Sequence, residues 1–479
     1  MKSSKANGSS PGLQVNPPAL PGTHGALALL LFINLFNYLD RQVLAAVVPE
    51  IRQTLFNTPG DSSSSLSGFL NWFQTSFGFK PENALIGLLS MAFMVTYMLC
   101  APIFGRMAEA RSRWLLIGLG VILWSLASGG TGLAGSFLVL LLTRCCVGVG
   151  EAAYGPIAPA VISDFYPVQK RGQVLAWFYM AIPVGSALGF IFGEQMAHVF
   201  GWRWAFYCVV LPGMALGLFA LFKKEPPRGQ SDLAHALSPH RVAWKDYRVL
   251  VRTPSYVLNT FGMCAMTFAI GGMAFWMPDY LKEYRGVTGS TGTMFGLLLT
   301  VAGIAATLLG GLAGDKLRTR FPGSYFLVSA AAMFAGFPLF LGVLYAPFPL
   351  AWVFIFLACF CLFFNTGPTN TILANVTHPA MRAQAFALNI LLIHALGDVI
   401  SPVIIGIVSD KWNMNAAFLL VGIMFMVSGI FWTLGARQLA RDTELAPKRF
   451  AENEFVRSSH DPHCGEGCSN HAADASDNA

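Results

Sequence analysis

The sequence GRMAEARSR, residues 105–113, recurs in outline as GLAGDKLRTR at residues 311–320. In both segments a glycine stands four residues before an acidic residue (Gly105–Glu109 and Gly311–Asp315), and basic residues follow. One such motif is a weak signal. Two copies at matching places in a long chain indicate duplicated structural units. The sequence therefore predicts two related halves.

The apolar segments around these motifs predict a membrane protein. The chain has 479 residues, of which 54% are hydrophobic and 11% are charged, whereas soluble proteins carry about a quarter charged residues. A helix needs ~20 apolar residues to cross the bilayer, and lipid leaves only helices for segments of this length. We expect an all-α membrane protein with twelve transmembrane helices, over residues 25–48, 83–105, 114–135, 137–162, 173–197, 201–222, 256–280, 292–313, 324–345, 349–373, 384–408 and 414–436.

The loops predict the orientation and the division of the chain. Lys and Arg gather in the loops on the side of the N-terminus, which predicts that both termini are cytoplasmic. The longest loop on that side separates the spans into two six-helix bundles. The predicted parts are a disordered N-terminal tail (1–24), an N-terminal bundle (25–222), a cytoplasmic linker (223–255), a C-terminal bundle (256–440) and a disordered C-terminal tail (441–479).

Four charged residues lie deep in two spans of the first half. Asp40 and Arg41 are adjacent in FNYLDRQVLA (36–45), and Arg144 and Glu151 lie in the fourth span. Each charge costs at least ~2.5 kcal/mol at the centre of a helix, which favours a functional role. At 1.5 Å per residue, the first pair and Arg144 reach similar depths in helices of opposite direction. Because Arg144 and Glu151 are nearly two turns apart, they share a helix face. The four are expected to meet at one cavity.

The side-chain chemistry indicates the roles at that cavity. Arg41 and Arg144 are candidates for substrate binding, because a guanidinium suits a carboxylate or phosphate. Asp40 and Glu151 are candidates for proton coupling, because burial favours the protonated form of a carboxyl group. The alternative is a structural ion-pair network between the first and fourth spans.

Polar residues of the second half are further candidates for substrate binding. Asn365, Thr366 and Asn370 surround a Gly-Pro pair in the tenth span, and His394 and Asp398 share one face of the eleventh. The alternative for the last two is a hydrogen bond between packed helices.

The seventh span reads FGMCAMTFAIGGMAFWM (261–277) and predicts an adaptable apolar wall. Facing a charged wall, it would suit an amphiphile. The alternative is that its Met and Phe side chains lie in the core or face lipid.

Other features carry less chemistry. Glu194 is near an outer helix end and is expected to reach water. Residues 65–79 are amphipathic and predict a surface helix, with a lid over the outer opening as a further role. The tail HDPHCGEGCSNH (460–471) matches no zinc module, so we expect no metal. We find no P-loop and no nucleophile constellation, so we expect neither a cofactor nor an enzyme.

With its repeated loops and twelve spans, the chain resembles the major facilitator superfamily over nearly its whole length. In that family the Gly-acid-basic loop latches the cytoplasmic side. The first copy departs from the family pattern, with Glu109 in place of Asp and Ala110 in place of Arg. The resemblance implies a conformational latch made by Gly105, Glu109, Arg113, Gly311, Asp315 and Arg318.

The eleventh span narrows this resemblance. RAQAFALNILLIHALGDVISPVIIGIVSD (382–410) resembles the Spinster family in its H-x-x-G-D-x-x-S-P run, and NYLDR (37–41) and GVGEAAYGPIAPAVISD (148–164) also fit. Members of that family are proton-linked transporters of lysophospholipids and sphingoid lipids such as sphingosine-1-phosphate. The resemblance implies such a transporter, with Asp40, Arg41, Arg144 and Glu151 in coupling and headgroup binding.

The alternative within the superfamily is a proton-coupled organic-anion or sugar-acid transporter, which also uses N-Y-x-D-R in the first span. The expected partners are a small amphiphilic lipid and protons, with no nucleic acid. We expect a monomer in a bacterial inner membrane.

Overall fold

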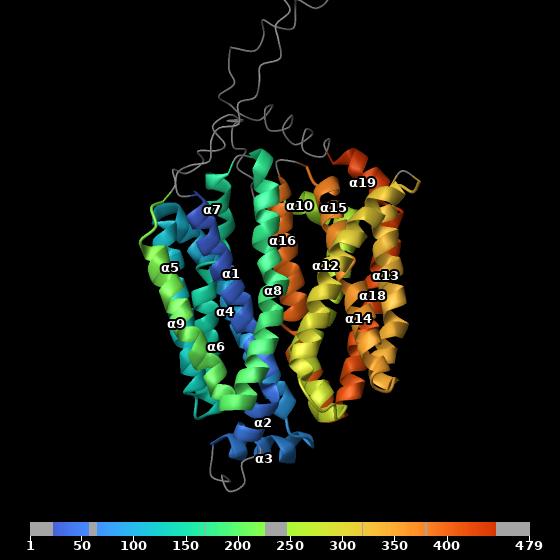
Figure 1. The fold of residues 1–479 in the computed structure, drawn as a ribbon. Coiled ribbons are helices and arrows are strands. Elements are labelled where there is room, and N and C mark those ends of the chain that lie inside the picture. The colour runs from blue at the N-terminus through green and yellow to red at the C-terminus, as the bar shows by residue number, and fades with distance from the viewer. Residues whose placement is uncertain are drawn as a thin grey trace, which may run out of the picture.

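The computed structural model describes residues 23–56, 65–166, 168–225, 247–318, 320–378 and 381–446, and every regular element within them is helical (Figure 1). The helices of the first half are α1 (Thr23–Ala46), α2 (Val48–Leu55), α3 (Ser65–Phe77), α4 (Glu82–Ala110), α5 (Arg113–Gly132), α6 (Phe137–Ala152), α7 (Ile157–Phe165), α8 (Val168–Phe200) and α9 (Trp202–Leu221). The helices of the second half are α10 (Tyr247–Val251), α11 (Pro254–Asp279), η2 (Tyr280–Tyr284), α12 (Thr291–Arg318), α13 (Ser324–Tyr345), α14 (Leu350–Phe363), α15 (Thr366–Val376), α16 (Arg382–Ile393), η4 (His394–Asp398), α17 (Ser401–Lys411), α18 (Met414–Ala436) and α19 (Leu439–Leu445).

Twelve stretches of these described residues are long and apolar enough to cross a membrane. The prediction of an all-α protein with twelve transmembrane helices is thus confirmed. Helix α10 lies within the predicted linker, and α19 lies at the start of the predicted C-terminal tail. The remaining parts of both tails, and most of the linker, lie outside the described residues.

The two ends of the molecule carry different short elements. Helices α2 and α3 lie at one end, at the bottom of Figure 1, and α19 lies at the other. Following the bias of Lys and Arg, we call the end with α2 and α3 the outer end and the opposite end the inner end.

The helices pack as two bundles, and we call the helix pairs that join the bundles seams. In the first half α1 packs on α8, α5 on α9, and α4 on α6; in the second half α18 packs on both α11 and α13. Between the halves, α4 packs on α17 and α8 packs on α12. Each of these two seams joins the second span of one half to the fifth span of the other, so they are equivalent by the internal repeat.

Three spans are interrupted near the middle of the membrane. The fourth is broken between α6 and α7, the tenth is broken between α14 and α15, and the eleventh contains the π-helical turn η4. The fourth and tenth spans occupy the same place in their halves, so the break is part of the repeat. Irregular backbone at this depth is tolerated where it faces protein or a cavity, and π-turns are frequent at functional sites. The breaks therefore point to the middle of the molecule.

The loop between the first two spans contains the predicted helix, α3. Phe69, Trp72 and Phe77 are exposed on it, and Phe73 packs between the last of these and Phe79, with ring centroids 4.5 Å and 5.3 Å away. The helix is thus confirmed, while its contact with the membrane surface and its role as a lid stay predictions.

Two adjacent glycines of α12 give a direct test of the packing of the second half. A Cβ at Gly310 would overlap the backbone carbonyl of Phe364, whereas a Cβ at Gly311 would meet nothing within 4 Å. We expect Gly310→Ala to destabilise the protein by about 1–3 kcal/mol, the usual effect of overpacking. The measurement is thermal unfolding in detergent, with Gly311→Ala as the matched control. Equal melting temperatures for the two variants would contradict this close approach.

Candidate binding cavity

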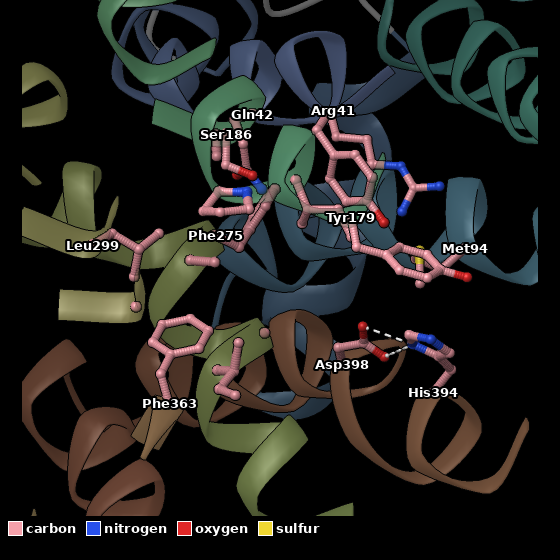
Figure 2. A pocket seen from close by; sticks show the side chains of 18 of the residues that line it. Arg41, Gln42, Met94, Tyr179, Ser186, Phe275, Leu299, Phe363, His394 and Asp398 are labelled. Atoms are coloured by element: carbon pink, nitrogen blue, oxygen red, sulfur yellow. Dashed lines mark hydrogen bonds and ion pairs between the residues drawn. The ribbon is translucent and has the colours of Figure 1, made fainter. Parts of the chain in front are cut away.

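A cavity of about 920 Å³ lies between the two halves. Figure 2 shows Arg41 and Tyr179 on one side of it, and Asp398 with His394 on the other. Among polar and apolar side chains of α1, α4, α6 and α8, the wall from the first half carries the charged side chains of Arg41, Arg144 and Glu151. The wall from the second half is mainly apolar, apart from Thr307 and the residues of η4 and α15.

Arg41 is held on the charged wall by an ion pair and by aromatic rings. Its Nε donates to Glu151 Oε2 at 2.7 Å, which joins α1 to the last turn of α6. Its guanidinium also lies 4.9–5.2 Å from the ring centroids of Tyr38, Phe93 and Tyr97. A desolvated cation gains from such rings. The Arg41 side chain keeps 17% of its surface exposed while Glu151 keeps none, although both line the cavity.

Asp40 lies away from the cavity, although it is next to Arg41 in the sequence. Its Oδ2 accepts a hydrogen bond of 2.5 Å from Ser128 Oγ of α5, and its Oδ1 is buried without a hydrogen-bond partner. Adjacent residues on a helix are about 100° apart, which separates the two side chains. Of the four predicted charges, the three others line the cavity and Asp40 is packed behind it.

Arg144 lines the cavity with part of its hydrogen-bonding capacity unused. Its Nη2 donates to Thr131 Oγ1 at 2.6 Å, and its guanidinium lies 5.3 Å from the ring centroid of Phe206. Its Nε is buried and has no hydrogen-bond partner. An unpaired guanidinium donor beside a cavity favours an anionic ligand, because a buried donor without a partner costs free energy.

The opposite wall carries the predicted histidine and aspartate as a pair. His394 Nδ1 lies 3.0 Å from both carboxylate oxygens of Asp398, within the π-helical turn η4 (Figure 2). Gly271 of α11 makes room for this turn, since a Cβ there would lie 2.5 Å from the Asp398 Cβ. The pair is therefore exposed to the cavity by a local irregularity of the helix.

The polar residues predicted in the tenth span are divided by its break. Thr366 and Asn370 line the cavity. Asn365 does not, because it is fully buried and its Nδ2 donates to the Cys361 carbonyl of α14 at 2.8 Å. It lies in the break between α14 and α15, as the N-cap residue of α15.

The methionines of the seventh span do not form the predicted wall. Met263, Met266, Met273 and Met277 are buried in the core of the second half. From this span, Phe275 lines the cavity together with smaller neighbours. The apolar lining of this half is instead shared among Ile270, Ala274, Phe275, Leu299, Ile304, Leu308 and Phe363.

Comparison with known proteins places the chain among transporters. The model of the Major Facilitator Superfamily matches residues 30–400. Human protein spinster homolog 1 is 36% identical over 429 residues, covering 84% of this chain and 76% of the human protein. Zebrafish (Danio rerio) protein spinster homolog 3 is 31% identical, covering 88% of this chain and 86% of the fish protein. This chain belongs to the Spinster family of the Major Facilitator Superfamily. It is an integral, multi-pass membrane transporter.

Solved structures agree with the fold of this Spinster-family chain. A bacterial homologue of the human lysosomal transporter Spinster, in an inward-facing and unoccupied conformation, aligns with a TM-score of 0.72 and 21% identity, covering 90% of this chain and 99% of that one. The xylose transporter of E. coli, in an inward-open conformation, aligns with a TM-score of 0.64 and 14% identity, covering 86% of this chain and 96% of that one.

The latch residues of the first half form bonds within their own bundle. Arg113 Nη1 lies 2.5 Å from Asp164 Oδ2, and its Nε donates to Glu225 Oε1 at 2.8 Å. Burial raises the pKa of Glu225, but hydrogen bonds from the Arg113 side chain and backbone outweigh it and hold this pKa below its ordinary value. Gly105 has open space where a Cβ would stand. The side chain of Glu109 lies outside the described residues.

The second copy of the latch also bonds locally. Asp315 Oδ1 accepts a hydrogen bond of 2.7 Å from Tyr325 OH of α13. A Cβ added at Gly311 would meet no described atom within 4 Å, and Arg318 lies in the last turn of α12. The two copies thus occupy matching inner helix ends, and the bonds above do not cross between the bundles.

Sequence reasoning missed the small hydroxyl partners and the rings around the charges. Ser128 and Thr131 bind Asp40 and Arg144 from α5. Their only signal is that they are hydroxyl residues in an otherwise apolar span. Which hydroxyl faces which charge depends on the packing of α5, and the sequence does not give that packing.

The ion pair between Arg41 and Glu151 predicts a strong coupling in stability. We expect Glu151→Leu to destabilise the protein by about 3–5 kcal/mol, because it leaves a buried guanidinium without its partner. Arg41→Leu combined with Glu151→Leu should recover much of that loss, since no charge is left unpaired. Thermal unfolding of the two single variants and the double variant measures this coupling. Additive losses would show that the pair contributes nothing as a pair.

Proposed function

We propose that this chain is a proton-coupled secondary transporter of anionic amphiphilic lipids, of the lysophospholipid or sphingosine-1-phosphate kind, acting by alternating access. The observation that carries the proposal is the two-sided cavity. One wall presents arginines, and the other is largely apolar. An amphiphile needs both surfaces at once.

The proposed headgroup site is formed by Arg41 and Arg144. Both line the cavity, and both are guanidinium groups, which match the geometry of a phosphate. Arg144 has a buried Nε without a partner, so a phosphate oxygen there would satisfy a donor that is now unpaired. The Asp398–His394 pair, with Thr366 and Asn370, faces the same space and would contact the rest of a headgroup.

The proposed tail site is the apolar wall of the second half. Leu299 and Phe363 lie on that wall opposite the charged side (Figure 2). Burial of an acyl chain releases about 0.8 kcal/mol per methylene group, which supports affinity for a long-chain substrate. A sugar acid has no such chain and would leave this wall without a partner.

Protons are proposed to act through Glu151 and Asp40. Glu151 neutralises Arg41 in this structure. Protonation of Glu151 would remove that ion pair and free the guanidinium for an anionic headgroup, which links proton uptake to substrate binding. Asp40 is buried with one oxygen unpaired, and a carboxylate in that position costs less when it carries a proton.

The relatives support the assignment as a transporter, and the name of one of them mentions a cellular location. One solved neighbour is described as a homologue of a human lysosomal transporter. For this chain we propose a bacterial inner membrane, as expected from the sequence. We also propose that it acts as a monomer, because residues of one chain line the whole cavity.

The coupling role predicts the behaviour of Asp40→Asn. We expect it to abolish uptake driven by a pH gradient in proteoliposomes, because an amide cannot bind and release a proton. The asparagine can still accept the Ser128 hydrogen bond, so folding should remain intact. Exchange of labelled for unlabelled substrate without a gradient is the control and should persist. Wild-type gradient-driven uptake in this variant would contradict the role.

The headgroup role predicts a selective loss in binding. Arg41→Ala and Arg144→Ala should each weaken binding of a lysophospholipid about tenfold or more, in line with 1.5–3 kcal/mol for a hydrogen bond to a charged group. Binding of an uncharged monoacylglycerol of equal chain length should change little. Calorimetry on the purified protein compares the two ligands, and a sugar acid serves as the third. Equal losses for both lipids, or binding of the sugar acid alone, would overturn the proposal.

A further inference from the structure

The first N–H groups of two helices at the outer end, α4 and α12, have no partner within their own helices. Helix α4 has Pro81 as its N-cap residue, and no side chain of that residue can accept a hydrogen bond. In α4 the first helical bond runs from Leu85 N to the Pro81 carbonyl, and in α12 it runs from Met294 N to the Ser290 carbonyl. The N–H groups of the residues between lack partners within the helix, and each helix start carries a partial positive charge.

A carboxylate from the opposite bundle satisfies these groups in both helices. Asp410, in the last turn of α17, accepts from Asn83 N at 3.0 Å and from Ala84 N at 2.8 Å, with one oxygen for each. Glu194, near the end of α8, accepts from Gly292 N and Thr293 N, both at 2.9 Å, again with one oxygen for each. The expectation that Glu194 simply reaches water therefore misses its main contacts.

The two contacts have the same register. In each case the carboxylate binds the second and third residues of the helix, counted from the residue that follows its N-cap. In each case the acid lies in the outer part of the fifth span of one half, and the helix start belongs to the second span of the other. The two contacts therefore join corresponding helices of the internal repeat, although Glu194 lies six residues before the end of α8 and Asp410 one residue before the end of α17.

Glycines bring the same helices into close contact just below each cap. A Cβ at Gly87 of α4 would overlap the backbone of Pro402 in α17, and a Cβ at Gly296 of α12 would lie 3.1–3.3 Å from atoms of Ala187 and Phe190 in α8. Close backbone approach holds each acid at the end of the facing helix. Opening the outer side must separate both pairs of helices. The four N–H···O bonds then break, and their N–H groups and carboxylates bind water instead.

Side-chain contacts also join the outer ends. The Asn83 amide donates to Tyr284 OH and Ser409 Oγ. Thr293 Oγ1 of α12 donates to Glu194 Oε2 of α8.

Arg52 of α2 donates from Nη2 to Asn83 Oδ1 at 2.6 Å and to Asp279 Oδ2 at 2.8 Å, so it ties the centre of the outer end to α4 and α11. Lys282 pairs with Glu50 at 2.5 Å, but its side chain is 42% exposed. An exposed pair contributes little.

We propose that Glu194 and Asp410 form a matched pair of trans-bundle helix caps that lock the outer gate shut. Each carboxylate accepts hydrogen bonds from the N-terminal N–H groups of a helix in the other bundle. These bonds exist only while the outer ends are together. The two locks together set how often the transporter opens outward. This inference concerns the gate and holds for whichever substrate occupies the cavity.

The direct test removes both charges and measures the opening of the outer end. The variant is Glu194→Gln with Asp410→Asn, in which an amide NH₂ replaces one accepting oxygen at each cap. Spin labels at positions 133 and 345, at the exposed outer ends of α5 and α13, report the separation of the bundles by double electron–electron resonance in nanodiscs. The native cysteines are replaced in this background.

We expect the ratio of outward-open to outside-closed molecules to rise about tenfold in the double variant, equivalent to about 1.4 kcal/mol. Each single variant should give about a threefold rise, because the two caps are equivalent. The matched control is Glu283→Gln, which removes an exposed outer carboxylate that makes no hydrogen bond to the other bundle within the described part of the chain. A wild-type distance distribution in the double variant, or an equal shift in the control, would overturn the proposal.

A second test leaves both acids in place. Pro81→Ser supplies α4 with an N-cap side chain of its own, which can accept from Asn83 N or Ala84 N, so α4 depends less on Asp410. We expect this variant to open outward about threefold more often than wild type. Added to Asp410→Asn it should change little, since the same cap is already lost. No shift in Pro81→Ser, or fully additive shifts, would count against capping. Thermal unfolding and size-exclusion profiles confirm that each variant is folded.

Discussion

The lack of water inside the bilayer is the constraint on which the rest of this structure depends. Every backbone N–H and C=O at that depth must bond within the protein, and every regular element of the described chain is helical. Some of the spans are nonetheless interrupted. The fourth and tenth spans break, and the eleventh takes a π-turn, where their backbone approaches the central cavity. At the outer end, two helix starts find their partners in the opposite bundle. Irregular backbone in this transporter therefore marks either the site or the gate.

The same constraint explains how charges are arranged in the first half. Arg41 is neutralised by Glu151 and surrounded by three aromatic rings, while Asp40 bonds to Ser128 behind the cavity wall. Arg144 has a hydroxyl partner, but its Nε remains unpaired. The unpaired donor of Arg144 supports the proposal that this cavity binds an anion, because each unpaired buried group costs free energy.

The two ends of the molecule are held in different ways, which matters for alternating access. At the outer end the bonds described above cross between bundles, through Arg52 at the centre and a carboxylate cap on each side. At the inner end Arg113 and Asp315 bond within their own bundles. The outer bonds must break and be replaced for the transporter to reverse. Because the halves are duplicated, the same kind of helix contact occurs twice at the outer end, between α4 and α17 and between α12 and α8.

The sequence by itself determined the membrane class, the twelve helices, the duplication and the set of charged residues, because each depends on composition, local periodicity or spacing along the chain. It also indicated the depth at which Arg41 and Arg144 lie, since helix rise is constant. Only the tertiary structure decided which way each side chain faces. Asp40 lies behind the cavity, the methionines of α11 lie in the core, and Asn365 bonds to the preceding helix, α14. The roles of Glu194 and Asp410 also required the fold. Their partners are backbone N–H groups on distant helices. Nearly every residue type has such a group, so the sequence does not indicate which residues will donate.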